Sequence, residues 1–127
     1  MARKASATLT DGEQRLMEVL WDRRSATVAE VQAAVTYPRK PAFNTVQTML
    51  RILERKGYIK HTAEGRAFRY HPVVNRQQAS TSAIRHLLDR FFDGAAGKLA
   101  INILEHEQLS DRDVQQLRRL LREARQR

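Results

Sequence analysis

The chain has 127 residues, enough for one domain of ordinary size or a small domain with an appendage. It contains no cysteine, which excludes disulfides, thiolate metal sites and thiol catalysis. The net charge is +9, from 23 Lys and Arg against 14 Asp and Glu, and this excess favours a polyanionic partner. No apolar run approaches a membrane span and the first residues lack the apolar core of a signal peptide, so we expect a cytoplasmic protein without membrane insertion.

The first predicted elements are a basic arm and two short helices. Residues 1–8 are basic, small and without periodicity, which predicts a flexible arm. The run Thr10-Asp-Gly-Glu13 is a capping box, and it opens a helix that extends to about Asp22. A second box, Thr27-Val-Ala-Glu30, opens a helix that ends before Tyr37-Pro38.

The segment Asn44–Lys56 predicts a third helix, around which the domain is organised. Its apolar residues recur at helical spacing and form one narrow stripe: Val46, Met49, Leu50 and Leu53. The opposite face is polar and cationic, with Asn44, Thr48, Arg51 and Arg55, and Gln47 at its border. We expect Asn44 to cap the helix and Gly57 to end it. Such a helix fits the major groove of DNA, although an ordinary surface helix with a solvated face is the alternative.

The order of these elements is typical of a helix-turn-helix. Two short helices are followed by the stiff basic connector Pro38-Arg39-Lys40-Pro41, and the basic-faced helix then takes the recognition position.

After Gly57 the periodicity becomes alternating and predicts a β-hairpin. The runs Tyr58–Thr62 and Ala67–His71 flank a turn that we expect to centre on Glu64-Gly65. One face then carries Ile59, His61, Phe68 and Tyr70, which we expect to pack. The other carries Lys60, Thr62 and Arg69, which look outward, with Arg66 at the tip. A cationic hairpin in this position predicts a wing that contacts phosphates or the minor groove, whereas simple solubility is the alternative role of its arginines.

The candidate DNA-binding residues follow from these two elements. Arg can fork onto guanine, Gln onto adenine, and Thr methyl groups can contact thymine, so we expect base contacts from Thr45, Gln47, Thr48 and Arg51. Phosphate contacts are expected from Arg39, Lys40, Arg55, Arg66 and Arg69, and from the helix start at Asn44.

Residues 74–127 predict three more helices. Asn75 caps the first, which extends to about Phe92; Gly94 and Gly97 bracket a break before Lys98–His106, and Ser110 with Asp113 opens the last. Their apolar faces exceed what a small winged domain can bury, which predicts a homodimer. The expected dimerisation residues are Ile84, Leu87, Leu88, Phe91, Leu99, Ile103, Leu104, Val114, Leu117, Leu120 and Leu121.

The predicted fold class is therefore mainly α with a small β-hairpin. We expect a flexible arm over 1–8, a winged helix-turn-helix DNA-binding domain over 9–73 and a helical dimerisation region over 74–127.

Four runs of the sequence resemble the penicillinase-repressor family of the BlaI and MecI type. They are Leu9–Trp21, Thr45–Ile59, the wing end Phe68-Arg-Tyr70, and the tail Leu99–Ser110. The resemblance covers nearly the whole chain, and its combination of helix, wing and tail is more specific than the winged helix alone. It implies a homodimeric transcriptional repressor on a dyad operator of double-stranded DNA.

The resemblance also implies a mode of induction. Members of the family are cleaved after an Asn in the dimerisation region by a membrane sensor protease that responds to β-lactam, and the corresponding bond here is Asn102-Ile103. The family's bond is typically Asn-Phe, so this chain departs from the pattern. Copper-responsive relatives carry a cysteine cluster that this chain lacks, which excludes copper sensing through thiolates.

The sequence also bears on three rival functions: an enzyme, a protein-binding module and a repressor released by a ligand. The four histidines lack metal-ligand spacing and no phosphate loop or nucleophile elbow is present, so we expect no enzyme activity, no metal and no cofactor. A winged-helix module that binds only protein, and a repressor released by a small-molecule ligand between the dimer helices, remain alternatives.

Overall fold

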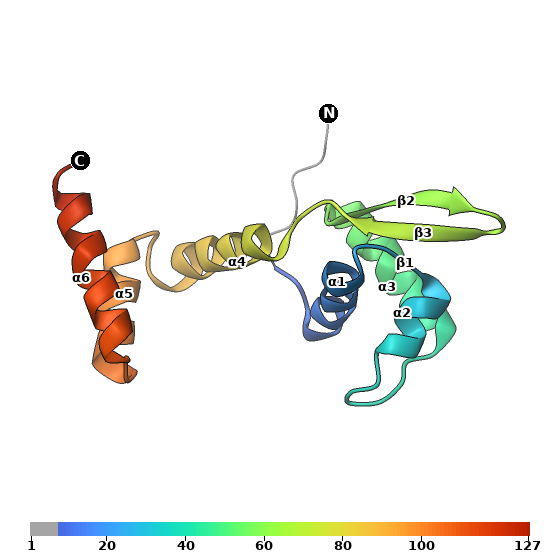
Figure 1. Cartoon of the computed structure of the whole chain (residues 1–127), viewed down its shortest axis with the longest axis horizontal. Coiled ribbons are helices and arrows are strands. Elements are labelled where there is room, and N and C mark those ends of the chain that lie inside the picture. The colour runs from blue at the N-terminus through green and yellow to red at the C-terminus, as the bar shows by residue number, and fades with distance from the viewer. Residues whose placement is uncertain (1–7) are drawn as a thin grey trace. The chain divides into compact units, whose positions relative to one another are not determined.

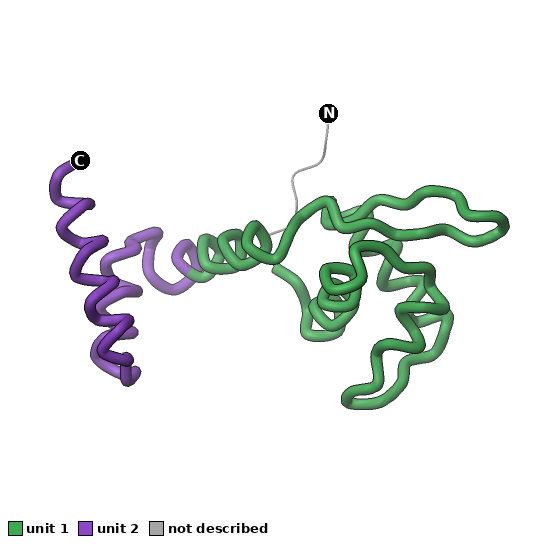
Figure 2. Tube along the Cα trace, in the orientation of Figure 1, with its two compact units in different colours: residues 1–87 green, residues 88–127 purple. Residues whose placement is uncertain are grey.

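The computed structural model describes residues 8–127, which form six helices and one small antiparallel sheet (Figure 1). The chain divides into two compact units: the first ends at Leu87 and the second comprises Leu88–Arg127 (Figure 2). The predicted fold class is confirmed. None of the helices between residues 8 and 127 combines the length and apolar character needed to cross a membrane. The expected arm lies almost entirely in residues 1–7, outside the described residues.

The two predicted capping boxes are confirmed. Helix α1 covers Asp11–Arg23 and helix α2 covers Val28–Ala34. In each case the threonine hydroxyl before the helix accepts a hydrogen bond from the backbone of the glutamate three residues later, and that glutamate's side chain accepts one from the threonine's backbone. Both helix starts are therefore fixed by local chemistry.

Helix α3 covers Phe43–Lys56 and begins one residue earlier than expected. Its N-cap is Ala42, without a side-chain hydrogen bond, so the prediction that Asn44 caps the helix is wrong. The backbone N–H of Val46 already donates to the carbonyl of Ala42, which places Asn44 inside the first turn. The predicted end is confirmed, because Gly57 adopts a left-handed φ of 91°.

The hairpin consists of β2, Ile59–Glu64, and β3, Ala67–Pro72. A two-residue turn at Gly65-Arg66 joins them, one residue later than predicted, and Gly65 has a positive φ of 61°. Moving such a turn by one residue shifts the cross-strand pairing by two, so the predicted sharing of faces survives. A short strand that was not expected, β1 at Ala26–Thr27, pairs with β3 and gives the order β1-β3-β2.

Only the base of the hairpin packs against the core, so the expected packing of its whole inner face is wrong. Ile59 and Tyr70 are buried, whereas His61 and Phe68 are exposed. The distal half of β2 and β3 extends past the helices, as Figure 1 shows. The inner face therefore changes from core to surface along the strand.

The core of the first unit lies between α1, α2, α3 and the sheet. The predicted apolar stripe of α3 faces it: Val46, Leu50 and Leu53 are fully buried and Met49 is half-buried. Gly12 of α1 makes room for Met49, because a Cβ at Gly12 would lie 2.8 Å from the Met49 Cε. Burial of this stripe fixes which face of α3 is directed to solvent.

The remaining helices are α4 at Arg76–Phe91, α5 at Ala96–His106 and α6 at Asp111–Arg125. The predicted caps are present, since the Asn75 side chain accepts from the backbone of Gln78 and Ser110 accepts from Asp113. Gly94 has a positive φ of 74° at the break. Gly97 lies inside α5 and does not bound the break, which corrects that expectation.

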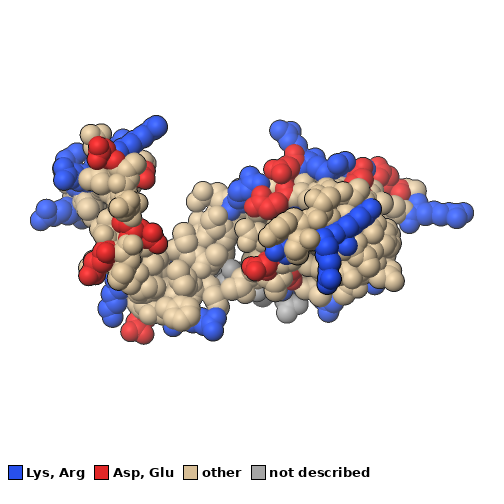
Figure 3. All heavy atoms as spheres, turned by 90° about the horizontal axis from the view of Figure 1, so that it is seen from below, with Lys and Arg blue, Asp and Glu red and all other residues tan. Residues whose placement is uncertain are grey.

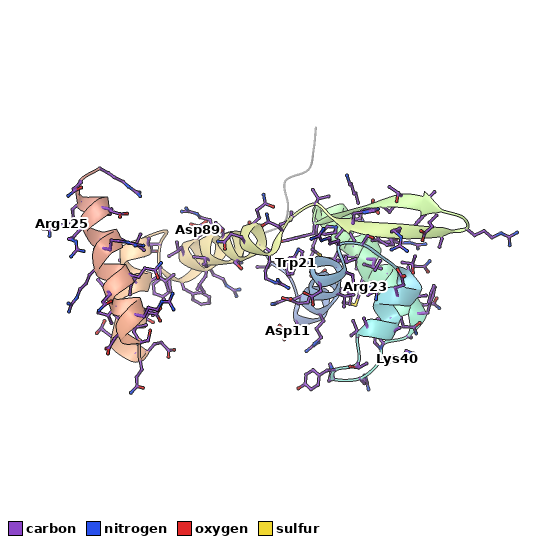
Figure 4. All side chains as sticks on the ribbon, viewed as in Figure 1. Asp11, Trp21, Arg23, Lys40, Asp89 and Arg125 are labelled. Carbon is purple, nitrogen blue, oxygen red and sulfur yellow. The ribbon has the colours of Figure 1, made fainter. Side chains whose placement is uncertain are left out.

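The start of α4 packs onto α1 within the first unit. Trp21 Nε1, on the side chain labelled in Figure 4, donates to the Val74 carbonyl at 2.9 Å. Arg76 forms ion pairs with Glu18 and Asp22, and Ala79 is buried in the core. The unit consequently continues beyond residue 73, where the sequence placed the end of the winged domain.

One buried carboxylate links the start of α1 to the end of α3. The Glu13 side chain is only 5% exposed, accepts from the Thr10 backbone and lies 2.8 Å from Lys56 Nζ. Burial raises the pKa of Glu13, but the hydrogen bonds from Lys56 and Thr10 and the Lys56 charge outweigh burial, so the pKa lies below 4.5. The charged form of Glu13 is therefore the one that stabilises the fold.

We predict that Glu13→Gln lowers the free energy of unfolding at pH 7 by about 1–3 kcal/mol, because the Lys56 ammonium loses its partner. The loss is measured by urea denaturation followed through Trp21, the chain's one tryptophan. Because the folded pKa is depressed, this stabilisation is complete above about pH 4.5 and is lost as the pH falls through the folded value. Glu123→Gln, in an exposed helical pair, is the control. If the difference in unfolding free energy between the wild type and Glu13→Gln stayed constant down to low pH, the stabilising role of the Glu13 carboxylate would be contradicted.

Candidate nucleic-acid interface

The solvent face of α3 carries the residues that the sequence selected for base contacts. Asn44, Thr45, Thr48 and Arg51 are exposed and Gln47 is half-buried at the border, because the buried stripe occupies the other side of the helix. Arg51 and Arg55 form no ion pair or hydrogen bond with any residue in the range 8–127. Their guanidinium groups are free to bind an external partner.

The connector before α3 adds two exposed cations. Arg39 and Lys40 likewise have no acidic partner within the described range, and Figure 4 labels Lys40 on the loop between α2 and α3. Gln32 Nε2 donates to the Pro41 carbonyl at 3.2 Å, which holds this loop to α2. The basic connector is thereby positioned next to the start of α3.

The two arginines of the wing differ. Arg66 is exposed at the turn and has no ion-pair partner among residues 8–127. Arg69, expected to look outward, is only 25% exposed and is bound at 3.1 Å to Glu30 and at 3.0 Å to Glu64. It also donates to Ser25 Oγ. The reason is β1, which pairs with β3 and places the start of α2, with Glu30, beside Arg69.

This cluster shifts the acid–base properties of its members. The hydrogen bonds with Glu64, together with the Glu30 charge, raise the pKa of Arg69 despite some desolvation. The Thr27 backbone hydrogen bond and the Arg69 and Arg23 charges lower the pKa of Glu30. These shifts keep Arg69 and Glu30 charged near neutral pH, and the ion pairs of Arg69 join the wing to α2.

Most acidic residues of the winged domain are paired with a basic side chain. Of the acidic residues between 8 and 73, all except Asp11 have a basic partner: Glu13 with Lys56, Glu18 and Asp22 with Arg76, Glu30 with Arg23 and Arg69, Glu54 with His61, and Glu64 with Arg69. Among residues 8–73, the cations without an acidic partner include those on the connector, α3 and the wing tip, and also Arg15, Arg24 and Lys60. Figure 3 shows basic side chains projecting from this unit, with acidic ones among them.

Sequence reasoning missed how His61 links the wing to α3. Its Nδ1 lies 2.7 Å from a carboxylate oxygen of Glu54, and its ring stacks on Phe68 with centroids 4.2 Å apart. The alternation of the strand indicated the stacked pair, but nothing local indicated Glu54. Within residues 8–127 no group of three or more His, Asp or Glu side chains is arranged to hold a metal ion.

The comparisons with known proteins agree with this geometry. The family profile described as "Penicillinase repressor" matches residues 9–123. The chain belongs to the penicillinase repressor family. A curated member, the "Penicillinase repressor" of Bacillus licheniformis, is 31% identical over 115 residues, which cover 91% of this chain and 90% of that protein.

More distant members of the penicillinase repressor family match over similar lengths. The "Methicillin resistance regulatory protein MecI" of Mammaliicoccus sciuri is 21% identical over 89% of this chain and 92% of that protein. Among solved structures, the DNA-binding domain of the repressor BlaI is 32% identical and superposes with a TM-score of 0.52. It covers 59% of this chain and 92% of its own. The winged-helix fold is therefore that of a repressor's DNA-binding domain.

The different environments of the wing arginines give a test. We predict that Arg69→Gln lowers the melting temperature, because Glu30 and Glu64 then repel each other without a shared cation, whereas Arg66→Gln leaves it unchanged. Thermal denaturation followed by Trp21 fluorescence measures both variants side by side. Equal melting temperatures for the two variants would refute the structural role of Arg69.

Proposed function

We propose that the chain is a sequence-specific repressor that acts as a homodimer on a dyad operator. The observation that carries the DNA-binding part is the free cationic and amide face of α3, bordered by the basic connector and Arg66. A duplex offers what these groups lack, namely phosphates for the free cations and base edges for the side chains of α3.

The contacts divide by chemistry. Arg51 can donate two hydrogen bonds to guanine and Gln47 can pair with adenine, while Thr45 and Thr48 bring methyl groups to thymine. Phosphate contacts fall to Arg39, Lys40, Arg55 and Arg66, which set the register of the protein on the duplex. Asn44, inside the first turn of α3, can donate a side-chain amide N–H to a phosphate of the duplex. We leave Arg69 out of this set because its two carboxylate partners neutralise it.

The dimer rests on the apolar surface of α5 and α6. Neither helix contains a buried residue within the single chain. The exposed large apolar side chains from α4 onward are Ile84, Leu87, Phe91, Ile101, Ile103, Leu104, Leu117, Leu120 and Leu121. Leu88, expected at the interface, is buried inside the chain, and Leu99 and Val114 are half-buried. A second copy would remove this surface from water, and two recognition helices would then read two half-sites.

Induction by proteolysis completes the proposal. Weakening the dimer weakens operator binding steeply, because each half-site supplies only part of the contact energy. Asn102 and Ile103 are both exposed in α5, and the proposed cut between them would divide the dimerisation region. A membrane sensor protease that responds to β-lactam or to cell-wall stress would act on this bond, and the repressor would work in the cytoplasm.

Base readout by Arg51 is tested with gel-shift titrations on the operator and on single-base variants. We predict that Arg51→Ala costs about 1–3 kcal/mol at one base position and relaxes specificity there. Arg66→Ala should weaken binding to all sequences alike. It should also reduce, by about one, the slope of the logarithm of the affinity against the logarithm of the salt concentration. Arg125→Ala, in the last turn of α6, serves as the control. If Arg51→Ala weakened all sequences equally, the base contact would be wrongly assigned.

Dimerisation is tested separately from base readout. Leu121→Asp places a charge on the apolar face of α6, and we predict a monomer that binds a single half-site normally and the dyad weakly. Gln115→Asp adds the same charge to the polar side of α6 and should leave the dimer intact. Light scattering gives the oligomeric state at micromolar concentration, and titration gives the affinities. A wild-type protein that is monomeric under these conditions would end the dimer proposal.

A further inference from the structure

A cavity of about 260 Å³ lies between α3, the start of α2 and the wing. Phe43 and Gln47 line it from α3, and Arg66 and Phe68 line it from the wing. No acidic side chain is among its lining residues. Because Gln47 and Arg66 line it together with the two phenylalanines, whatever fills it meets an apolar wall next to an amide and a cation.

The two phenylalanines of this cavity are exposed to an extent that needs a reason. Phe43 is 44% exposed and Phe68 is 47% exposed. Between residues 8 and 73 the structure has two other exposed large apolar side chains, Tyr37 on the connector and Val73 after β3, and neither lines this cavity. Exposed apolar side chains that lie close together beside polar groups are characteristic of a binding surface.

Both phenylalanines are carried by ordered elements before any ligand arrives. Phe43 is the first residue of α3, so its backbone belongs to the recognition helix. Phe68 is stacked on His61, and His61 is held by Glu54 of the same helix. Phe68 of the wing is therefore linked to α3 through the side chains of His61 and Glu54. Such preorganisation reduces the entropy lost on binding.

The chemistry of the walls selects the occupant. Arg66 of the wing and Arg51 and Arg55 of α3 are positively charged, which favours DNA over an apolar peptide as the occupant. Of the groups that bases present in the major groove, the C5-methyl of thymine is the apolar one. We propose that the cavity bounded by Phe43 and Phe68 receives a thymine C5-methyl, which makes Phe43 a specificity-determining residue. This inference rests on the proposed DNA-binding function, and it adds a contact to the threonines and arginine already assigned.

The test removes only the methyl group. A duplex selected by the full-length protein from a random pool is resynthesised with deoxyuridine in place of each thymine, one position at a time. We expect the wild-type affinity to fall about fourfold at one position of each half-site in addition to those contacted by Thr45 and Thr48, the effect of burying one methyl-sized group. At that position Phe43→Ala should bind the thymine and uracil duplexes equally well, and Phe68→Ala should reduce the difference.

Two variants control for damage to the fold. Phe43→Leu keeps an apolar wall and should retain part of the uracil penalty, which a general loss of folding would not do. Val73→Ala alters an exposed apolar residue that does not line the cavity and should retain the full penalty. Melting curves of all variants confirm that each is folded.

The outcomes separate this inference from the proposed function. If the wild type binds its selected duplex specifically but is indifferent to every uracil, or if Phe43→Ala keeps the wild-type penalty at every sensitive position, the methyl contact is refuted and the repressor function stands. If no duplex is selected above random sequence, the proposed function itself fails. A selected site without thymine in its half-sites also refutes the methyl contact.

Discussion

The fold of the first unit depends on a single buried ion pair at the meeting point of α1 and α3. Glu13 closes the capping box of α1 and, with the same carboxylate, binds Lys56 in the last turn of α3. A charged carboxylate with so little exposure persists only when its hydrogen bonds are satisfied, and here both partners are close. The pair therefore couples the start of one helix to the end of another. Together with the apolar stripe of α3, it fixes the face that this helix presents to solvent.

The distribution of ion pairs gives the unit its binding surface more than its net charge does. Apart from Asp11, the acidic residues on α1, α2 and the strands are paired with cations that hold elements together, such as Arg69 between Glu30 and Glu64. Several cations without an acidic partner in the described range, including Arg51 and Arg66, lie on the connector, α3 and the wing tip. In the proposed complex a phosphate backbone would meet cations that are not already paired with a carboxylate, and structural and binding roles would be carried by different arginines.

The sequence predicted those features that are encoded locally. Both threonine capping boxes and the left-handed end at Gly57 follow from residues a few positions apart, and each is confirmed. Features that depend on distant partners were missed. A two-residue strand such as β1 has no detectable periodicity, and without it nothing places Glu30 beside Arg69, 39 positions away in the chain. The exposure of Phe43 was also hidden, because the helix start was assigned one residue too late.

The helical state of α5 has a consequence for how fast the repressor could be turned over. Proteases accept extended backbone, yet the Asn102 carbonyl accepts a hydrogen bond from the His106 side chain within an intact helix. Cutting the bond after Asn102 would first require this turn to unwind, so local opening would set the pace of signalling. Pairing of two chains through α5 would suppress that opening. The assembled repressor would then be the slow substrate, and the few dissociated chains would be consumed first.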